Sequence, residues 1–138
     1  MQNWKVKPKI YSGDGFQDCI ILSFGKPKTA IYAHMDSIGF TVKYNNEIIK
    51  IGGPVIKNGI ELVGSDSKGK IEGKIIKKDE KVFIDFKRVI DRGTSLTFKM
   101  NFKDDNDYIQ SCYLDNRLGV WNALKVAENL EDGIIVFS

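Results

Sequence analysis

The chain has 138 residues, of which 42% are hydrophobic, and a formal net charge of +3. This length fits one domain, or one domain with a small insertion, and it suffices for a core without disulfide bonds. The lysines are scattered among acidic residues rather than gathered in a stripe, which argues against a nucleic-acid partner. No apolar run reaches the ~18 residues of a membrane span and no signal-peptide pattern is present, so we expect a cytoplasmic protein without a membrane partner.

The first 44 residues predict three β-strands. Apolar runs at 19–24 (CIILSF) and 29–33 (TAIYA) are separated by a turn signal with Gly and Pro, which is typical of a hairpin. The second run predicts a strand buried on both faces, with His34 at or just beyond its end. A third run follows at 38–44 (IGFTVKY).

The pattern changes at residues 45–103. Short β-like runs recur there between turn signals, and no helical period is sustained, which predicts a small closed barrel or sandwich. Residues 64–70 (GSDSKGK) have the spacing of a phosphate-binding loop. A hairpin turn is the better interpretation, because the following Ser or Thr is missing and a strand pattern comes next rather than a helix.

The last part predicts a strand, a helix and a second strand. A strand-like run at 108–114 precedes the one convincing helix, residues 116–130, in which apolar residues recur every three or four positions. The predicted apolar stripe consists of Leu118, Trp121, Leu124, Ala127 and Leu130. The continuous apolar run at 133–138 (GIIVFS) is typical of a strand in a parallel sheet.

This order of elements predicts an α/β fold class with an all-β insertion. Residues 1–44 and 104–138 are expected to form the α/β domain. Residues 45–103 are expected to form an inserted β-barrel domain between its two parts.

Two short segments carry side chains suited to metal chemistry. The first is His34-Met35-Asp36, which contains the only histidine of the chain. A neutral imidazole can bind a metal ion while a carboxylate two positions further on fixes its tautomer. The second is Asp115, at a strand-to-helix junction where α/β sheets bind ligands and where a carboxylate can bridge two cations. The alternatives are a surface His34 and an Asp115 that caps the helix.

Together the two segments resemble a known enzyme family. AHMDSIGFTV followed, after the β-rich stretch, by LDNRLGVWNAL is similar to the glutamyl/deblocking aminopeptidases, dinuclear metallopeptidases some of which are labelled endoglucanase M. That family has an AHxDExGF-like segment, a small inserted β-barrel, and a D-[DN]-R-x-G segment that opens a helix. The resemblance spans nearly the whole chain. It implies a fragment of a zinc-peptidase-like α/β domain, corresponding to the N-terminal part of the family.

The resemblance also implies roles for five residues. His34 would be a ligand to one metal ion, Asp115 would bridge two ions, and Asp36 would be the catalytic-site carboxylate that orients the His34 imidazole. Asn116 and Arg117 would shape the substrate site. The two ions, zinc or cobalt in the family, would activate water for attack on the first peptide bond of a peptide substrate.

The chain departs from the family pattern after its last strand. In the family a Glu-Glu pair follows that strand and supplies the general base and a metal ligand, and a further carboxylate and a second histidine come later. Here Glu128 and Glu131 precede the strand at 133–138, and no such groups follow it. We therefore expect this chain to bind metal weakly and to be inactive without a C-terminal half.

Two other functions stay open from the sequence. One is a non-catalytic module in which the β-barrel binds a partner or self-associates, with the α/β part as a remnant. In the family this insertion often forms the dimer contact, so we expect a homo-oligomer through the barrel. The other is a small active hydrolase that uses Asp36 and Asp115 with a further group.

Overall fold

The structure is a computed structural model and describes residues 4–138. The chain divides into two compact units. The sheet–helix unit comprises residues 4–36 and Tyr113–Ser138, and the barrel unit comprises Ser37–Cys112. Residues 1–3, part of the expected α/β segment, lie outside the described residues.

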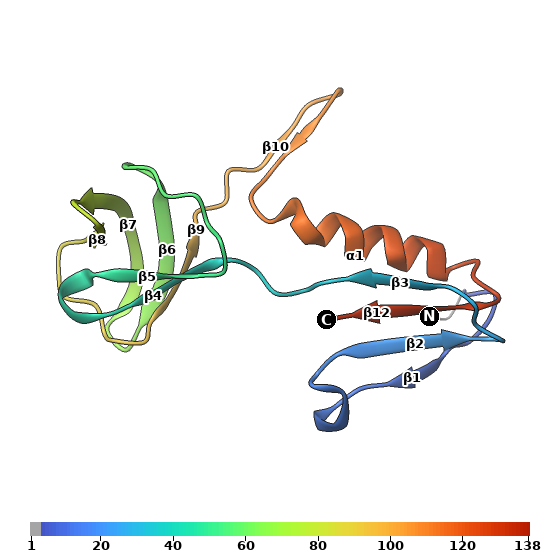
Figure 1. Ribbon diagram of the computed structural model, residues 1–138. Helices are drawn as coiled ribbons and strands as arrows, with labels where there is room; N and C mark the ends of the chain where they lie inside the picture. The colour runs from blue at the N-terminus through green and yellow to red at the C-terminus, as the bar shows by residue number, and fades with distance from the viewer. Residues whose placement is uncertain (1–3) are drawn as a thin grey trace. The chain divides into compact units, whose positions relative to one another are not determined.

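The sheet–helix unit contains a four-stranded sheet in the order β1–β2–β12–β3 (Figure 1). Its strands are β1 (Lys9–Tyr11), β2 (Ile20–Phe24), β3 (Ala30–Ala33) and β12 (Gly133–Phe137). A 3-10 turn, η1 (Asp14–Phe16), lies between β1 and β2. β12 pairs antiparallel with β2 and parallel with β3, so that Ile135 lies opposite both Leu22 and Ile31. The sheet is therefore mixed, because the last strand of the chain is inserted between two strands from its beginning.

Helix α1 (Leu114–Ala127) packs against this sheet through its smallest side chains. The core between helix and sheet consists of Leu22, Phe24, Ala33, Ala123, Ala127, Ile135 and Phe137. Ala123 and Ala127 lie one turn apart, and their small side chains let the helix approach the strands closely.

The predicted apolar stripe of the helix is wrong in part. Ala127 is buried, but the Leu118 and Trp121 side chains are 54% and 56% exposed. The helix carries apolar residues on more than one side, so the 3.6-residue period could not decide which side faces the sheet.

The barrel unit is built on a six-stranded antiparallel sheet in the order β5–β4–β9–β6–β7–β8. Its strands are β4 (Gly39–Val42), β5 (Ile48–Ile51), β6 (Glu61–Asp66), β7 (Gly69–Lys78), β8 (Lys81–Asp85) and β9 (Ser95–Phe98). A bridge between Glu47 and Phe83 links the two ends of the sheet, which makes the barrel nearly closed. Along β7 the buried Ile71, Gly73 and Ile75 alternate with exposed polar residues, as expected for a strand with one face on a core.

Three smaller features complete the barrel unit. A 3-10 turn, η2 (Tyr44–Asn46), connects β4 to β5, and a short hairpin of β10 (Lys103–Asp104) and β11 (Ile109–Gln110) follows β9. Asp66 pairs with Gly69 at the end of the β6–β7 ladder. The loop-like GSDSKGK stretch is therefore a hairpin turn, as the sequence indicated.

The barrel unit is longer than the predicted insertion of 45–103. It begins at Ser37 because β4, expected in the α/β domain, pairs with β5 and β9. Phe40 and Val42 on that strand point into the barrel core. Overall the chain is a mixed, sheet-rich protein with a nearly closed barrel, and α1 is the one α-helix among residues 4–138. No helix in that range is long and apolar enough to cross a membrane.

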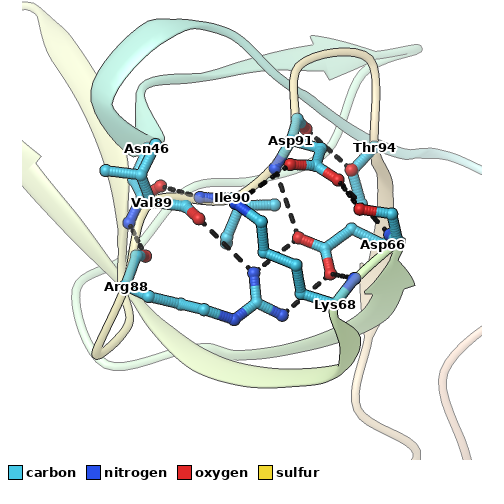
Figure 2. Close-up of polar contacts among 9 residues, drawn as sticks. Asn46, Asp66, Lys68, Arg88, Val89, Ile90, Asp91 and Thr94 are labelled. Atoms are coloured by element: carbon cyan, nitrogen blue, oxygen red, sulfur yellow. Dashed lines mark hydrogen bonds and ion pairs between the residues drawn. The ribbon is translucent and has the colours of Figure 1, made fainter.

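A buried ion pair joins the β6–β7 turn to the loop between β8 and β9, as Figure 2 shows. The Arg88 guanidinium donates to both oxygens of Asp66, at 2.6 and 2.8 Å, and the backbone N–H groups of Lys68 and Asp91 donate to the same carboxylate at 2.9 and 3.2 Å. The Asp66 side chain is fully covered. The Arg88 hydrogen bonds hold the pKa of Asp66 well below its ordinary value of 3.8, against the opposing effect of burial.

Asn46 reinforces the same loop. Its side-chain oxygen accepts from the backbone N–H of Ile90 at 2.8 Å, and its side-chain nitrogen donates to the carbonyl of Arg88 at 2.9 Å (Figure 2). The loop thereby places Ile90 in the barrel core.

We predict that Asp66→Asn lowers the Tm of the chain in thermal denaturation followed by circular dichroism. Because the folded-state pKa of Asp66 is depressed, its contribution to stability is fully present above its unfolded pKa of about 4 and is lost as pH falls below that value. The difference in Tm between wild type and variant should therefore narrow in acid. Lys81→Gln, which removes an exposed ion pair to Glu47 at 3.7 Å, is the control and should change Tm little. Equal Tm values for the two variants at neutral pH would contradict this role of Asp66.

Candidate metal site

His34 is held at the end of β3 by two backbone hydrogen bonds to the end of β12. The N–H of Ser138 donates to the carbonyl of Ala33 at 3.1 Å, and the N–H of Met35 donates to the carbonyl of Ser138 at 2.5 Å. The parallel ladder thus continues beyond both strands and fixes the backbone on either side of His34. This is the carboxyl end of a parallel strand pair, where ligands bind in open α/β sheets.

Asp115 enters the same region from the start of α1. Its backbone is not yet helical, with φ −85° and ψ 107°, and Asn116 after it has φ −122° and ψ 32°. Tyr113 before the helix has a positive φ of 66°. The chain therefore makes an irregular backbone step at the start of α1, and Asp115 lies at this step.

The three predicted side chains of the site form one chain of contacts. The Nε2 atom of His34 lies 3.0 Å from Oδ1 of Asp115, and its Nδ1 atom lies 3.1 Å from Oδ1 of Asp36. The structure thus brings His34, Asp36 and Asp115 together, although Asp115 is distant in the sequence. Side-chain exposure is 42% for His34, 83% for Asp36 and 93% for Asp115, so the group is open to solvent.

The two carboxylates act on the charge of the imidazole. The hydrogen bond to Asp115, followed by the interactions with Asp36, raises the pKa of His34 above its ordinary value of 6.5, while partial desolvation acts in the opposite direction. The cause is plain, since only the protonated ring can donate from both nitrogens at once.

The two remaining predicted residues lie beside this group. The side-chain amide of Asn116 lies over Gly119, one turn further along α1. The Arg117 guanidinium lies over the ring of Tyr113, with 5.4 Å between its central carbon and the ring centroid. The amide is therefore packed against the helix, and the guanidinium takes part in a cation–π contact.

The donor set fits part of a metal site. An imidazole nitrogen next to a carboxylate oxygen is a common pair of ligands for zinc, and a second carboxylate on the other ring nitrogen is the usual support of such a histidine. Zinc sites use at least three protein ligands, however. Among the described residues no group of three or more His, Cys, Asp or Glu side chains is arranged to hold a metal ion. These residues by themselves would therefore supply only part of such a site.

Comparison with known proteins defines the class of fold. No protein-family model matches the chain, and no curated protein matches its sequence. Solved structures do match its fold, and they include a TET1 peptidase and an endoglucanase, so the chain has a fold similar to that of these proteins.

Three of these structures show the extent of the similarity. The TET1 peptidase of Pyrococcus horikoshii, described as assembling into a tetrahedron or a large octahedral shell, is 20% identical with a TM-score of 0.67, over 94% of this chain and 50% of its own. An endoglucanase of Thermotoga maritima is 19% identical with a TM-score of 0.70, over 96% and 49%. A dodecamer named PhTET1-12s is 20% identical with a TM-score of 0.66, over 94% and 49%. The chain thus spans about half the length of the solved structures that it matches.

We predict that an NMR pH titration of the His34 ring shows a pKa above 6.5, and that Asp115→Asn moves it down toward that value. The reason is the loss of the negative charge that faces Nε2. Because His34 is the only histidine, its ring signals are assigned without ambiguity. Glu128→Gln, on the same helical segment but paired with Lys125, is the control and should leave the titration unchanged. An unaltered His34 pKa in Asp115→Asn would show that the two groups do not meet.

Proposed function

We propose that the chain forms part of a metal-dependent aminopeptidase of the glutamyl/deblocking type, which removes N-terminal residues from peptides. The observation that supports this most is the 3.0 Å contact between His34 and Asp115, with Asp36 on the other ring nitrogen. The two sequence segments on which the family resemblance rests thereby meet at one place. The peptidase-like fold is in keeping with the proposal.

Each residue has a distinct task in the proposed site. His34 binds one ion through Nε2, and Asp36 holds the opposite ring nitrogen and so keeps the ring in the orientation for binding. Asp115 offers two carboxylate oxygens, one for each of two ions. Asn116 and Arg117 line the approach to this carboxylate. Two zinc or cobalt ions supply Lewis acidity and water activation when bound.

The remaining ligands and the general base belong to a second half in this proposal. By the family resemblance these groups follow the strand that corresponds to β12, in a Glu-Glu pair and later residues. A carboxylate near the attacking water is needed to take up its proton. The 138 residues are therefore proposed to bind metal weakly and to leave peptides uncleaved until that half is present.

We predict weak binding of ZnCl₂ or CoCl₂ by the 138-residue chain, followed by NMR. Cobalt should broaden the ring signals of His34 first, and Asp115→Ala should abolish the response, because it removes one of the two ligands. Asp36→Asn should weaken it by about tenfold or more, the usual effect of removing a carboxylate that supports a metal-binding histidine.

The control for this titration is Glu128→Ala, which removes an exposed carboxylate outside the site. Tight uptake of two ions by the wild-type chain would contradict the proposal that the site is incomplete. Equal responses of the wild type and Asp115→Ala would contradict the assignment of Asp115 as a ligand.

A second proposed property is self-association through the barrel unit, which is also the function of the alternative, non-catalytic module. Four large apolar side chains on or beside the β10–β11 hairpin are more than half exposed: Met100, Phe102, Tyr108 and Ile109. Apolar groups gathered in this way on a surface commonly mark a protein contact. The related TET1 peptidase is described as assembling into shells.

We predict that light scattering gives a mass above the 15.6 kDa of one chain, and that Phe102→Asp or Ile109→Asp lowers it, because a charge would be buried in the contact. Val89→Asp is the matched control, since Val89 is an equally exposed apolar residue elsewhere in the barrel unit. A monomer at high concentration, or the same loss of mass in Val89→Asp, would contradict an interface at the hairpin.

A further inference from the structure

Gly119 occupies a helical position that costs stability without an evident backbone reason. Glycine is the poorest helix former after proline, yet this residue lies in the first regular turn of α1, which begins after Asn116. Its φ is not in the left-handed region, so a side chain would be compatible with its backbone. The reason for a glycine here must therefore lie in the space around it.

That space is occupied by one side chain. A Cβ atom at Gly119 would lie 1.9 Å from Oδ1, 2.7 Å from Cγ and 3.0 Å from Nδ2 of Asn116, and these three are its nearest neighbours. The nearest obstacle to a side chain at this position is therefore Asn116 and not a strand of the sheet. Any larger residue would displace the amide of Asn116 from this place.

Asn116 is part of the irregular backbone step at the start of α1, directly after Asp115. The backbone of both residues departs from helical values, and regular helix begins only after them. With its amide packed over Gly119, Asn116 is half-buried and its rotamer is restricted. Asp115, whose carboxylate lies 3.0 Å from His34, shares this backbone step with Asn116.

We propose that Gly119 is a positioning residue of the site: the missing Cβ gives the Asn116 amide its place on α1, and the packed amide holds the backbone step that aims Asp115 at His34. For its metal readout this inference rests on the proposed function. Its geometric part concerns only the contact between His34 and Asp115.

Gly119→Ala in the 138-residue chain tests the proposal with two readouts. The first, in metal-free protein, is the nuclear Overhauser effect between the His34 ring protons and the β protons of Asp115. The second is the response of the His34 ring to ZnCl₂. In Gly119→Ala we expect the Overhauser effect to disappear. We expect the response of the His34 ring to ZnCl₂ to weaken about tenfold, the usual effect of removing a group that supports a metal ligand. Gly15→Ala is the control, because a Cβ there meets nothing within 4 Å.

A purely structural role predicts a different result. If Gly119 were only a weak point in the helix, alanine would raise Tm and leave both readouts unchanged. That outcome, or an Overhauser effect retained in Gly119→Ala, would overturn the proposal. Asn116→Ala provides a second arm in case Gly119→Ala does not fold. It removes the same packed amide without adding a clash, so an Overhauser effect of wild-type strength in this variant would also overturn the proposal.

The double variant Asn116→Ala/Gly119→Ala should lose no more of the zinc response than either single variant, because both changes remove one arrangement. Additive losses would overturn the proposed coupling. If the wild type shows no zinc response while Gly119→Ala still loses the Overhauser effect, the metal function fails and the positioning role stands.

Discussion

The parallel pairing of β12 with β3 is the constraint on which the candidate site depends. It joins a strand near the beginning of the chain to one at its end, and its hydrogen bonds continue through Ser138 to both sides of His34. The same pairing places α1, which leads into β12, over the sheet, and so brings the start of that helix to the end of β3. Without this ladder His34 would be a loop residue with free backbone angles, and Asp115 would have no fixed partner.

The charge of the His34 ring at the candidate site depends on the two carboxylates beside it. A single imidazole lies between two exposed carboxylates, and both of them favour its protonated form. A metal ion at the proposed site would need the imidazole neutral. In the proposed site, proton and metal would compete for one nitrogen, and metal binding would release the proton. The arrangement is open to solvent.

The barrel unit is stabilised by different interactions. Its core is a closed set of aliphatic and aromatic side chains from all parts of the sheet, and its long β8–β9 loop is fixed by the Asp66–Arg88 pair and by Asn46. A covered carboxylate with four donors is fully satisfied, so it orders the loop without leaving an unpaired buried charge. Four of the apolar residues that the unit leaves exposed lie on and beside the β10–β11 hairpin and are not part of this core, so the surface proposed for self-association is distinct from the groups that keep the barrel folded.

The sequence by itself determined the kinds of element and the chemistry of the site residues. Short β-like runs marked the strands of the barrel, and GSDSKGK was predicted to be a hairpin turn. His34, Asp36 and Asp115 were predicted as site residues through the family resemblance, with a surface histidine and a helix cap as the open alternatives. Only the tertiary structure decided which strands pair, that β4 belongs to the barrel, and that Ala123 and Ala127 rather than Leu118 and Trp121 face the sheet. Local periodicity records which residues are apolar but not what they pack against, because pairing and burial are set by segments far apart in the chain. The role proposed for Gly119 could not be predicted from the sequence for the same reason. It depends on which atoms occupy the space where a Cβ would lie, and these come from another side chain.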